Sequence, residues 1–122
     1  MALLEFVSSV RGHYRTNPYH NFRHAFDVTQ TCYVYLKKGI MGRQLVSSLD
    51  VFALMVSALC HDIQHPGLTN SFQCSARTKL SLTYNDISVL ENMHASVTFH
   101  LLLGPNNDVK SGLLGKIEWL LP

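Results

Sequence analysis

The apolar residues of this chain recur mainly at the spacing of α-helices. A short amphipathic helix over residues 3–10 is predicted by the apolar positions Leu3, Phe6, Val7 and Val10. Periodicity and turn residues predict further helices over residues 20–38, 49–60, 71–80, 89–103 and 109–121. We therefore expect an all-α fold of about five to seven helices.

The run from Leu49 to Cys60 is apolar on nearly every helical face, which is typical of a helix that is buried on all sides. A β-strand is the alternative for such a run. Its length, its alanines and the polar Ser47-Ser48 pair before it favour the helix.

Turn and capping residues predict the boundaries between these helices. Asn17-Pro18 predicts a turn and the start of the second helix, with Asn17 able to cap it. His65-Pro66-Gly67 predicts a loop, because proline and glycine both interrupt regular structure. Gly104-Pro105 is a strong stop signal for the 89–103 helix.

Composition and charge narrow the class of protein. The 122 residues are 47% hydrophobic and 15% charged, which suits one folded domain. The formal net charge of +2 is too small and too scattered to predict binding to nucleic acid or to an anionic membrane. We expect no membrane span and no signal peptide. The three cysteines lack a C-x-x-C spacing, so we expect no thiolate zinc site, no disulfide framework and a cytoplasmic location.

Histidines carry most of the candidate chemistry, and five of the seven lie in three polar clusters beside apolar helices. The first cluster runs from His20 to His24. Histidines four positions apart lie on one face of a helix, so both rings can reach a common site. Two histidines on a solvated helix face are the alternative for this cluster taken alone.

The second cluster runs from His61 to Gly67, where the apolar 49–60 helix ends. Adjacent side chains on a continuous helix point about 100° apart, but a backbone turn at the helix end can bring His61 and Asp62 to one ion. Imidazole nitrogen together with carboxylate oxygen suits zinc, manganese or magnesium. A capped helix end is the alternative, which the cost of burying three polar residues disfavours.

The third cluster is Glu91-Asn92-Met93-His94, early in the predicted 89–103 helix. Glu91 could orient a metal-bound water or keep a histidine protonated. It could equally be a first-turn acid that the helix dipole favours. We expect His100 at the surface or in packing, and His13 belongs to no cluster.

These clusters, in this order and at these intervals, resemble the motifs of class I cyclic-nucleotide phosphodiesterases. The resemblance covers roughly residues 17–103, and the stretch from Asn17 to His24 is most similar to the cyclic-GMP-preferring type-nine branch. It implies that residues 1–122 are part of a catalytic domain with a compact multi-helix bundle of the phosphodiesterase type. The matching motifs are Tyr19-His20-Asn21-x-x-His24-Ala25, His61-Asp62-x-x-His65-Pro66-Gly67-x-x-Asn70 and Tyr84-Asn85-Asp86-x-Ser88-Val89-Leu90-Glu91-Asn92.

The resemblance also implies an activity, the hydrolysis of a 3′,5′-cyclic nucleotide to the 5′-nucleotide by in-line attack of a metal-bridging hydroxide on phosphorus. His20 is implied as the general acid that protonates the leaving O3′. The implied ligands of a Zn²⁺ ion are His24, His61 and Asp62, and Asp62 would bridge to a second ion, Mg²⁺ or Mn²⁺. The substrate phosphate would lie against His20, His24 and Asp62.

Two further residues are implied as supporting groups. His65 would orient water near the second ion, and Glu91 would form a hydrogen bond with the acid histidine His20. Met93 stands where the family has the first of two histidines. We therefore expect weaker polar support near the second ion.

The family carries a second metal-binding aspartate and a purine-binding glutamine on later helices. We expect neither in this chain, and so a catalytic domain truncated at its C-terminus, with residues 111–122 as an atypical end. The residues present do not distinguish cyclic GMP from cyclic AMP.

Two other functions remain open. One is a catalytically inactive fragment or interaction module that keeps only part of the metal site. The other is a broader HD-type phosphohydrolase, which the His20–His24 motif and Glu91 disfavour. Uncovered apolar faces of the 49–60 helix would also favour self-association, because large exposed apolar patches mark contact surfaces.

Overall fold

The computed structural model describes residues 2–39, 47–104 and 112–116. All regular structure within these ranges is helical, which confirms the predicted all-α class. The helices are α1 (Ala2–His13), α2 (Phe22–Lys38), α3 (Ser48–Cys60), α4 (Asn70–Ser75), α5 (Lys79–Thr83), α6 (Val89–Leu103) and α7 (Leu113–Lys116).

The second helix begins later than its sequence pattern predicts. Its N-cap is Asn21, whose side-chain oxygen accepts hydrogen bonds from the backbone amides of Arg23 and His24. Asn17 is therefore not the cap, and His20 lies in the segment before the helix rather than on it. The prediction that His20 and His24 share a helix face is wrong, although both still reach the same site.

The predicted 71–80 helix is two short helices, α4 and α5. Arg77, between them, has a left-handed backbone conformation with φ 46°. Thr78 then caps α5 by accepting a hydrogen bond from the amide of Ser81. An N-cap residue has an extended backbone, so the chain cannot stay helical through Thr78 and α4 and α5 are separate helices.

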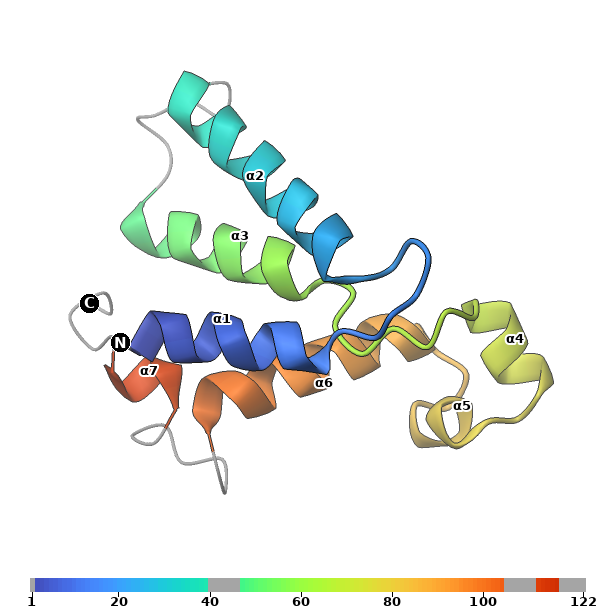
Figure 1. Cartoon of the computed structure of the whole chain (residues 1–122). Helices are drawn as coiled ribbons and strands as arrows, with labels where there is room; N and C mark the ends of the chain where they lie inside the picture. Colours follow the sequence, from blue (N-terminus) through green and yellow to red (C-terminus); the bar gives the residue numbers. More distant parts are fainter. Residues whose placement is uncertain (1, 40–46, 105–111, 117–122) are drawn as a thin grey trace.

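Most of the predicted 109–121 helix lies outside the described residues. Its described part is the short helix α7, which packs against α1 and α6. Figure 1 shows α7 next to the start of α1.

The core lies where α1, the C-terminal end of α3 and α6 meet (Figure 1). Val10 and Ile63 are fully buried there. The helix α2 packs against α3, and α4 and α5 pack against α6. The core residues are Phe6, Val10, Leu59, Cys60, Ile63, Leu102 and Leu113.

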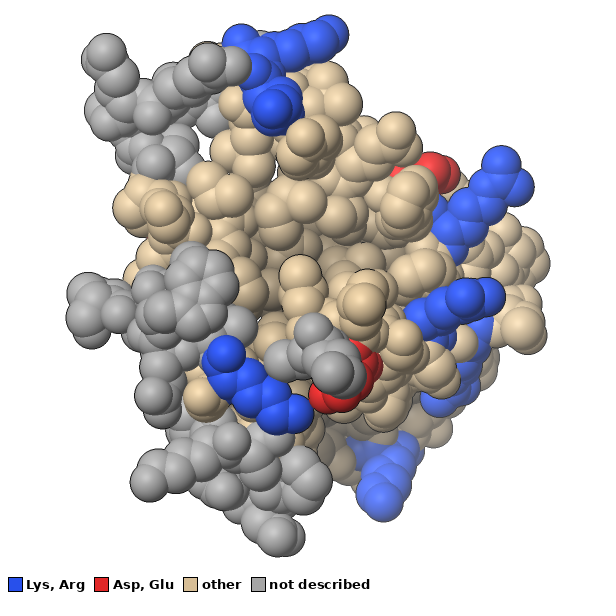
Figure 2. All heavy atoms as spheres, turned by 60° about the vertical axis from the view of Figure 1, so that its left-hand side comes forward, with Lys and Arg blue, Asp and Glu red and all other residues tan. Residues whose placement is uncertain are grey.

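The helix α3 is not buried on all sides, which corrects the expectation from its composition. Only its last turn, Ala58 to Cys60, is buried. Its earlier apolar side chains instead line a groove of 560 Å³ between α1, α2 and α3. Figure 2 shows a face with mostly uncharged side chains across its centre and Lys and Arg side chains mainly toward the edges. Groove residues include Phe6, Val7, Thr29, Val51, Phe52, Met55 and Val56.

Among the described residues, no helix has both the length and the apolar character that crossing a bilayer requires.

Candidate functional site

The fold brings the three polar clusters together. The start of α2, the end of α3 and the start of α6 lie near one another, with the connecting segments between them (Figure 1). His24 comes from α2, the cluster from His61 to His65 follows α3, and His94 lies on α6. Segments that are distant in sequence therefore supply one group of imidazoles around the Asp62 carboxylate.

His24, His61 and Asp62 form a compact triangle of donor atoms. The His24 and His61 Nε2 atoms are 3.2 Å apart, and they lie 3.4 and 3.1 Å from Asp62 Oδ2. Ligands about 2.0–2.1 Å from a tetrahedral ion are separated by roughly 3.3 Å. The spacing of the three atoms therefore suits one zinc-sized cation, and these residues form a candidate metal site.

The backbone after α3 explains how two adjacent residues point to one place. The helix ends at Cys60, and tight turns follow, in which the Ile63 amide donates to the Cys60 carbonyl and the His65 amide to the Asp62 carbonyl. His61 donates its Nδ1–H to the carbonyl of Ala58 at 2.9 Å. This hydrogen bond leaves the Nε2 lone pair of His61 free for a metal ion.

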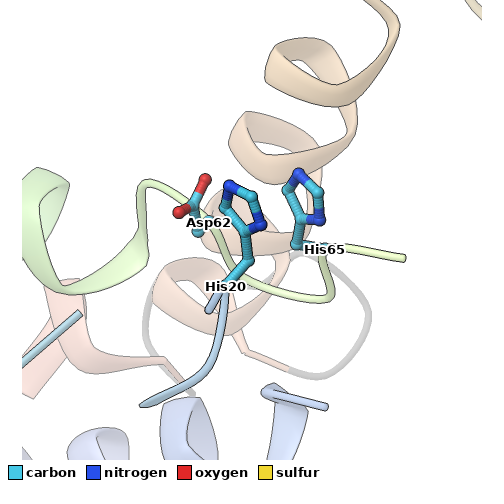
Figure 3. A group of neighbouring side chains, drawn as sticks. All are labelled: His20, Asp62 and His65. Carbon is cyan, nitrogen blue, oxygen red and sulfur yellow. The ribbon is translucent and has the colours of Figure 1, made fainter. Parts of the chain in front are cut away.

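A second group of potential ligands consists of His20, Asp62 and His65, which Figure 3 shows side by side with His20 in the middle. The rings of His20 and His65 are stacked with centroids 3.8 Å apart and an interplanar angle of 7°. One potential ligand atom from each of the three residues lies within 4.8 Å of the other two.

Asn17 joins the two segments that carry these stacked rings. Its Nδ2 group donates to the carbonyl of His20 at 3.0 Å and to the carbonyl of His65 at 2.7 Å. Gly67 lies against the same amide, because a Cβ there would come within 3.1 Å of Asn17 Oδ1 and the backbone φ is +79°. Glycine is therefore the residue that suits this position.

His65 is held as a neutral imidazole. Burial lowers its pKa, and the nearby His20 ring lowers it further. Its Nδ1 accepts a hydrogen bond from the Gly67 amide at 2.9 Å, so its remaining proton is on Nε2. His65 can thus donate one hydrogen bond into the site.

His94 is a site residue to which the sequence analysis assigned no role. Its ring is buried, its Nδ1–H donates to the Ile63 carbonyl at 2.6 Å, and its Nε2 lies 3.9 Å from Asp62 Oδ1. Burial lowers the pKa of His94. The available signal was its position three residues after Glu91, which places both near one face of α6.

Glu91 is positioned differently from the expectation. Its carboxylate accepts from Asn70 Nδ2 at 3.0 and 3.3 Å, and no hydrogen bond to His20 is present among the described residues. Asn70 Oδ1 also accepts from the Leu90 amide, so Asn70 takes the place of the missing side-chain cap of α6. The Asn70 hydrogen bond lowers the pKa of Glu91 and keeps it ionised.

The remaining two histidines lie outside the site. His13 and His100 each use Nδ1 to bond to a carbonyl four residues earlier in their own helices. His100 is exposed, as expected.

Comparison with known proteins gives a consistent result. Residues 19–118 match the sequence family described as 3′5′-cyclic nucleotide phosphodiesterase. Over 112 residues the chain is 51% identical to the 3′,5′-cyclic-nucleotide phosphodiesterase regA of Dictyostelium discoideum, covering 91% of this chain and 14% of that protein. It is 43% identical over 110 residues to the high affinity cGMP-specific 3′,5′-cyclic phosphodiesterase 9A of Mus musculus, covering 89% of this chain and 20% of that protein.

A solved structure shares the fold. The phosphodiesterase domain of the Salpingoeca rosetta rhodopsin phosphodiesterase superposes with a TM-score of 0.81 at 36% identity, covering 98% of this chain and 36% of that chain. The chain thus spans between a seventh and about a third of the lengths of these three relatives.

Proposed function

Because this chain belongs to the family of 3′,5′-cyclic-nucleotide phosphodiesterases, we propose that its histidine–aspartate site acts in the hydrolysis of a 3′,5′-cyclic nucleotide to the 5′-nucleotide. The observation that carries this proposal is the triangle of His24, His61 and Asp62, with separations of 3.1 to 3.4 Å. A neighbouring histidine, His20, is available for proton transfer. Both are groups that phosphodiester hydrolysis needs.

In this proposal His24, His61 and Asp62 hold a Zn²⁺ ion, and Asp62 also reaches a second ion, Mg²⁺ or Mn²⁺. Two features support the assignment to Asp62. Its Oδ2 belongs to the triangle, whereas its Oδ1 faces His94 on the other side. When bound, such cations lower the pKa of water and neutralise negative charge on phosphoryl oxygens.

His20 is proposed as the general acid that gives its proton to the departing O3′ of the substrate. Its ring is part-buried, stacks on His65 and lies beside Asp62 (Figure 3). Stacking fixes the plane of the ring, so its nitrogen atoms point in a set direction. His20, together with His24 and Asp62, is proposed to face the substrate phosphate.

His65 and Glu91 are proposed to support this chemistry without touching the reacting bond. The Nε2–H of neutral His65 can donate to a water or a phosphate oxygen in the site. The charge of ionised Glu91, fixed by Asn70, only partly offsets the lowering of the pKa values of His65 and His94 by burial. Glu91 therefore acts on the site electrostatically.

The substrate class is a 3′,5′-cyclic nucleotide, and the test uses both cyclic GMP and cyclic AMP. The chain, loaded with zinc and supplied with magnesium, is expected to convert one or both to the 5′-nucleotide, which chromatography of the products detects. A 3′-nucleotide product, or no product from a chain with full zinc occupancy, would contradict the proposal.

A further inference from the structure

The turn that carries His61 and Asp62 leaves backbone groups outside the hydrogen-bond pattern of α3. The Ile63 amide bonds to the Cys60 carbonyl, so the Leu59 carbonyl lacks its usual partner four residues later. The Asp62 amide also lies outside the helical hydrogen-bond pattern, because α3 ends at Cys60. A turn of this kind is stable only if other groups satisfy such atoms.

The hydroxyl of Tyr14 bonds to both of these groups. It donates to the Leu59 carbonyl at 2.9 Å and accepts from the Asp62 amide at 3.4 Å. A phenolic hydroxyl is suited to this bridge, because it has one proton to donate and lone pairs to accept with. Tyr14 lies just after α1, more than forty residues away in sequence.

The Tyr14 ring is itself fixed. It packs edge-on against Phe22, the first residue of α2, with centroids 5.9 Å apart. Burial raises the pKa of Tyr14 far above its usual value, so the hydroxyl keeps its proton. The ring thus links the start of α2, which carries His24, to the turn that carries the other two members of the triangle.

We propose that Tyr14 is a positioning residue that holds the turn after α3 in the conformation in which His61 and Asp62 converge on one cation with His24. This inference rests on the proposed function, because that function assigns a Zn²⁺ ion to the triangle of His24, His61 and Asp62. It predicts that the Tyr14 hydroxyl contributes to metal affinity although it touches no metal ligand side chain.

The alternative is an ordinary hydrogen bond that stabilises the fold and leaves the metal site unaffected. The two explanations differ in metal affinity, which a general loss of stability does not change in a chain that is still folded. Zn²⁺ affinity of the 122-residue chain, measured by competition with a chromogenic chelator, is therefore the readout.

Tyr14→Phe removes only the hydroxyl and keeps the ring against Phe22. Removing a group that orients metal ligands typically weakens binding by about 10–100-fold, and we expect at least about tenfold here. Ser47→Ala, which removes the N-cap at the far end of α3, lowers stability without touching the turn and is expected to bind Zn²⁺ like wild type. Tyr33→Phe removes a tyrosine hydroxyl on the exposed side of α2 and is the control for losing a hydroxyl away from the turn.

Phe22→Leu is a second variant that does not depend on the folding of Tyr14→Phe. It keeps the hydroxyl but removes the ring edge that orients it, so a smaller loss of Zn²⁺ affinity is expected. Equal affinity in wild type, Tyr14→Phe and Phe22→Leu, including no measurable binding in any of them, would overturn the inference. Turnover does not enter this comparison, so failure of the proposed hydrolysis and failure of the Tyr14 role are separate results.

Discussion

At the residue scale, His20 lies beside the triangle of His24, His61 and Asp62 rather than in it. Its ring stacks on His65 with centroids 3.8 Å apart. If His20 is the general acid, His20→Asn should lower kcat for cyclic-nucleotide hydrolysis by about 10²–10⁴-fold and leave the bound zinc unchanged. Steady-state kinetics and metal analysis of the same preparations measure both quantities.

The matched control is His100→Asn, which changes an exposed histidine on α6 outside the site. It should keep the wild-type kcat. A His20→Asn variant as active as His100→Asn would rule out the assignment of His20 as acid.

His94 should make the free energy of unfolding depend on pH. Burial lowers its pKa below the usual 6.5, so the unfolded chain binds more protons than the folded chain as the pH falls below about 6.5. The free energy of unfolding of the metal-free chain should therefore be highest above that pH and decrease as the pH falls. Thermal melts at pH 7.5 and 5.5 in a chelating buffer measure this decrease.

His94→Asn isolates the contribution of His94 to the pH dependence of stability. The asparagine amide can still donate to the Ile63 carbonyl, but it does not titrate. Its melting temperature should fall less than that of wild type between the two pH values. Some decrease should remain, since burial also lowers the pKa of His65. An unchanged pH dependence in His94→Asn would contradict the prediction.

The family resemblance implied His24, His61 and Asp62 as one ligand set, and their donor atoms do lie within 3.4 Å of one another. The residues that shape the site through the backbone were not assigned these roles. Tyr14 and Asn17 bond to main-chain groups 45 to 48 residues away, and such contacts have no local pattern. Asn70 matched a motif, but its hydrogen bonds with α6 become visible only in three dimensions.

At the scale of helices, two N-caps of similar strength lie at different distances from the site. Asn21 caps α2 one turn before His24, and Ser47 caps α3 through a capping box with Asp50 at the far end of that helix. Asn21→Ala and Ser47→Ala should each lower the free energy of unfolding by about 1 kcal/mol. Chemical denaturation measures these losses.

Zn²⁺ affinity should distinguish the two variants. The Asn21 side chain accepts from the backbone amide of His24 itself, so its loss disturbs a metal ligand, whereas Ser47 contacts no residue of the site. Weaker binding is expected in Asn21→Ala alone. Equal Zn²⁺ affinity in both variants would show that the cap only stabilises α2.

The positions of the long helices could be predicted well, and those of the short ones could not. The predicted range 49–60 matches α3 to within one residue and 89–103 matches α6, because apolar periodicity and capping or stop residues agree there. The break between α4 and α5 depends on the left-handed conformation of Arg77, for which arginine has no particular preference. The start of α2 was misplaced because Asn17 and Asn21 are both residues that favour N-caps.

At the scale of the whole molecule, the apolar groove between α1, α2 and α3 should favour self-association. Half-buried side chains such as Phe52 and Met55 line it, and apolar surfaces of this kind associate in water. Sedimentation at tens of micromolar is expected to show dimers or larger species. Met55→Lys should shift the chain toward the monomer, because a charge in the groove opposes its burial.

Leu82→Lys is the matched control, since Leu82 is 68% exposed on α5 and outside the groove. It should associate like wild type. A monomeric wild-type chain at these concentrations would contradict the predicted association.

Composition alone predicted the apolar character of α3, but the side of α3 that is left open depends on where α1 and α2 pack.

The most direct test of the central claim is the zinc content of Asp62→Asn compared with wild type, measured by native mass spectrometry. Asp62 Oδ2 lies 3.1 and 3.4 Å from the two imidazole nitrogens, and the substitution removes its charge while it keeps the shape of the side chain. We expect one zinc ion per wild-type chain and little or none in Asp62→Asn, with Asp27→Asn on α2 as a control that retains the ion. Equal zinc content in wild type and Asp62→Asn would contradict the metal site and the proposed function that rests on it.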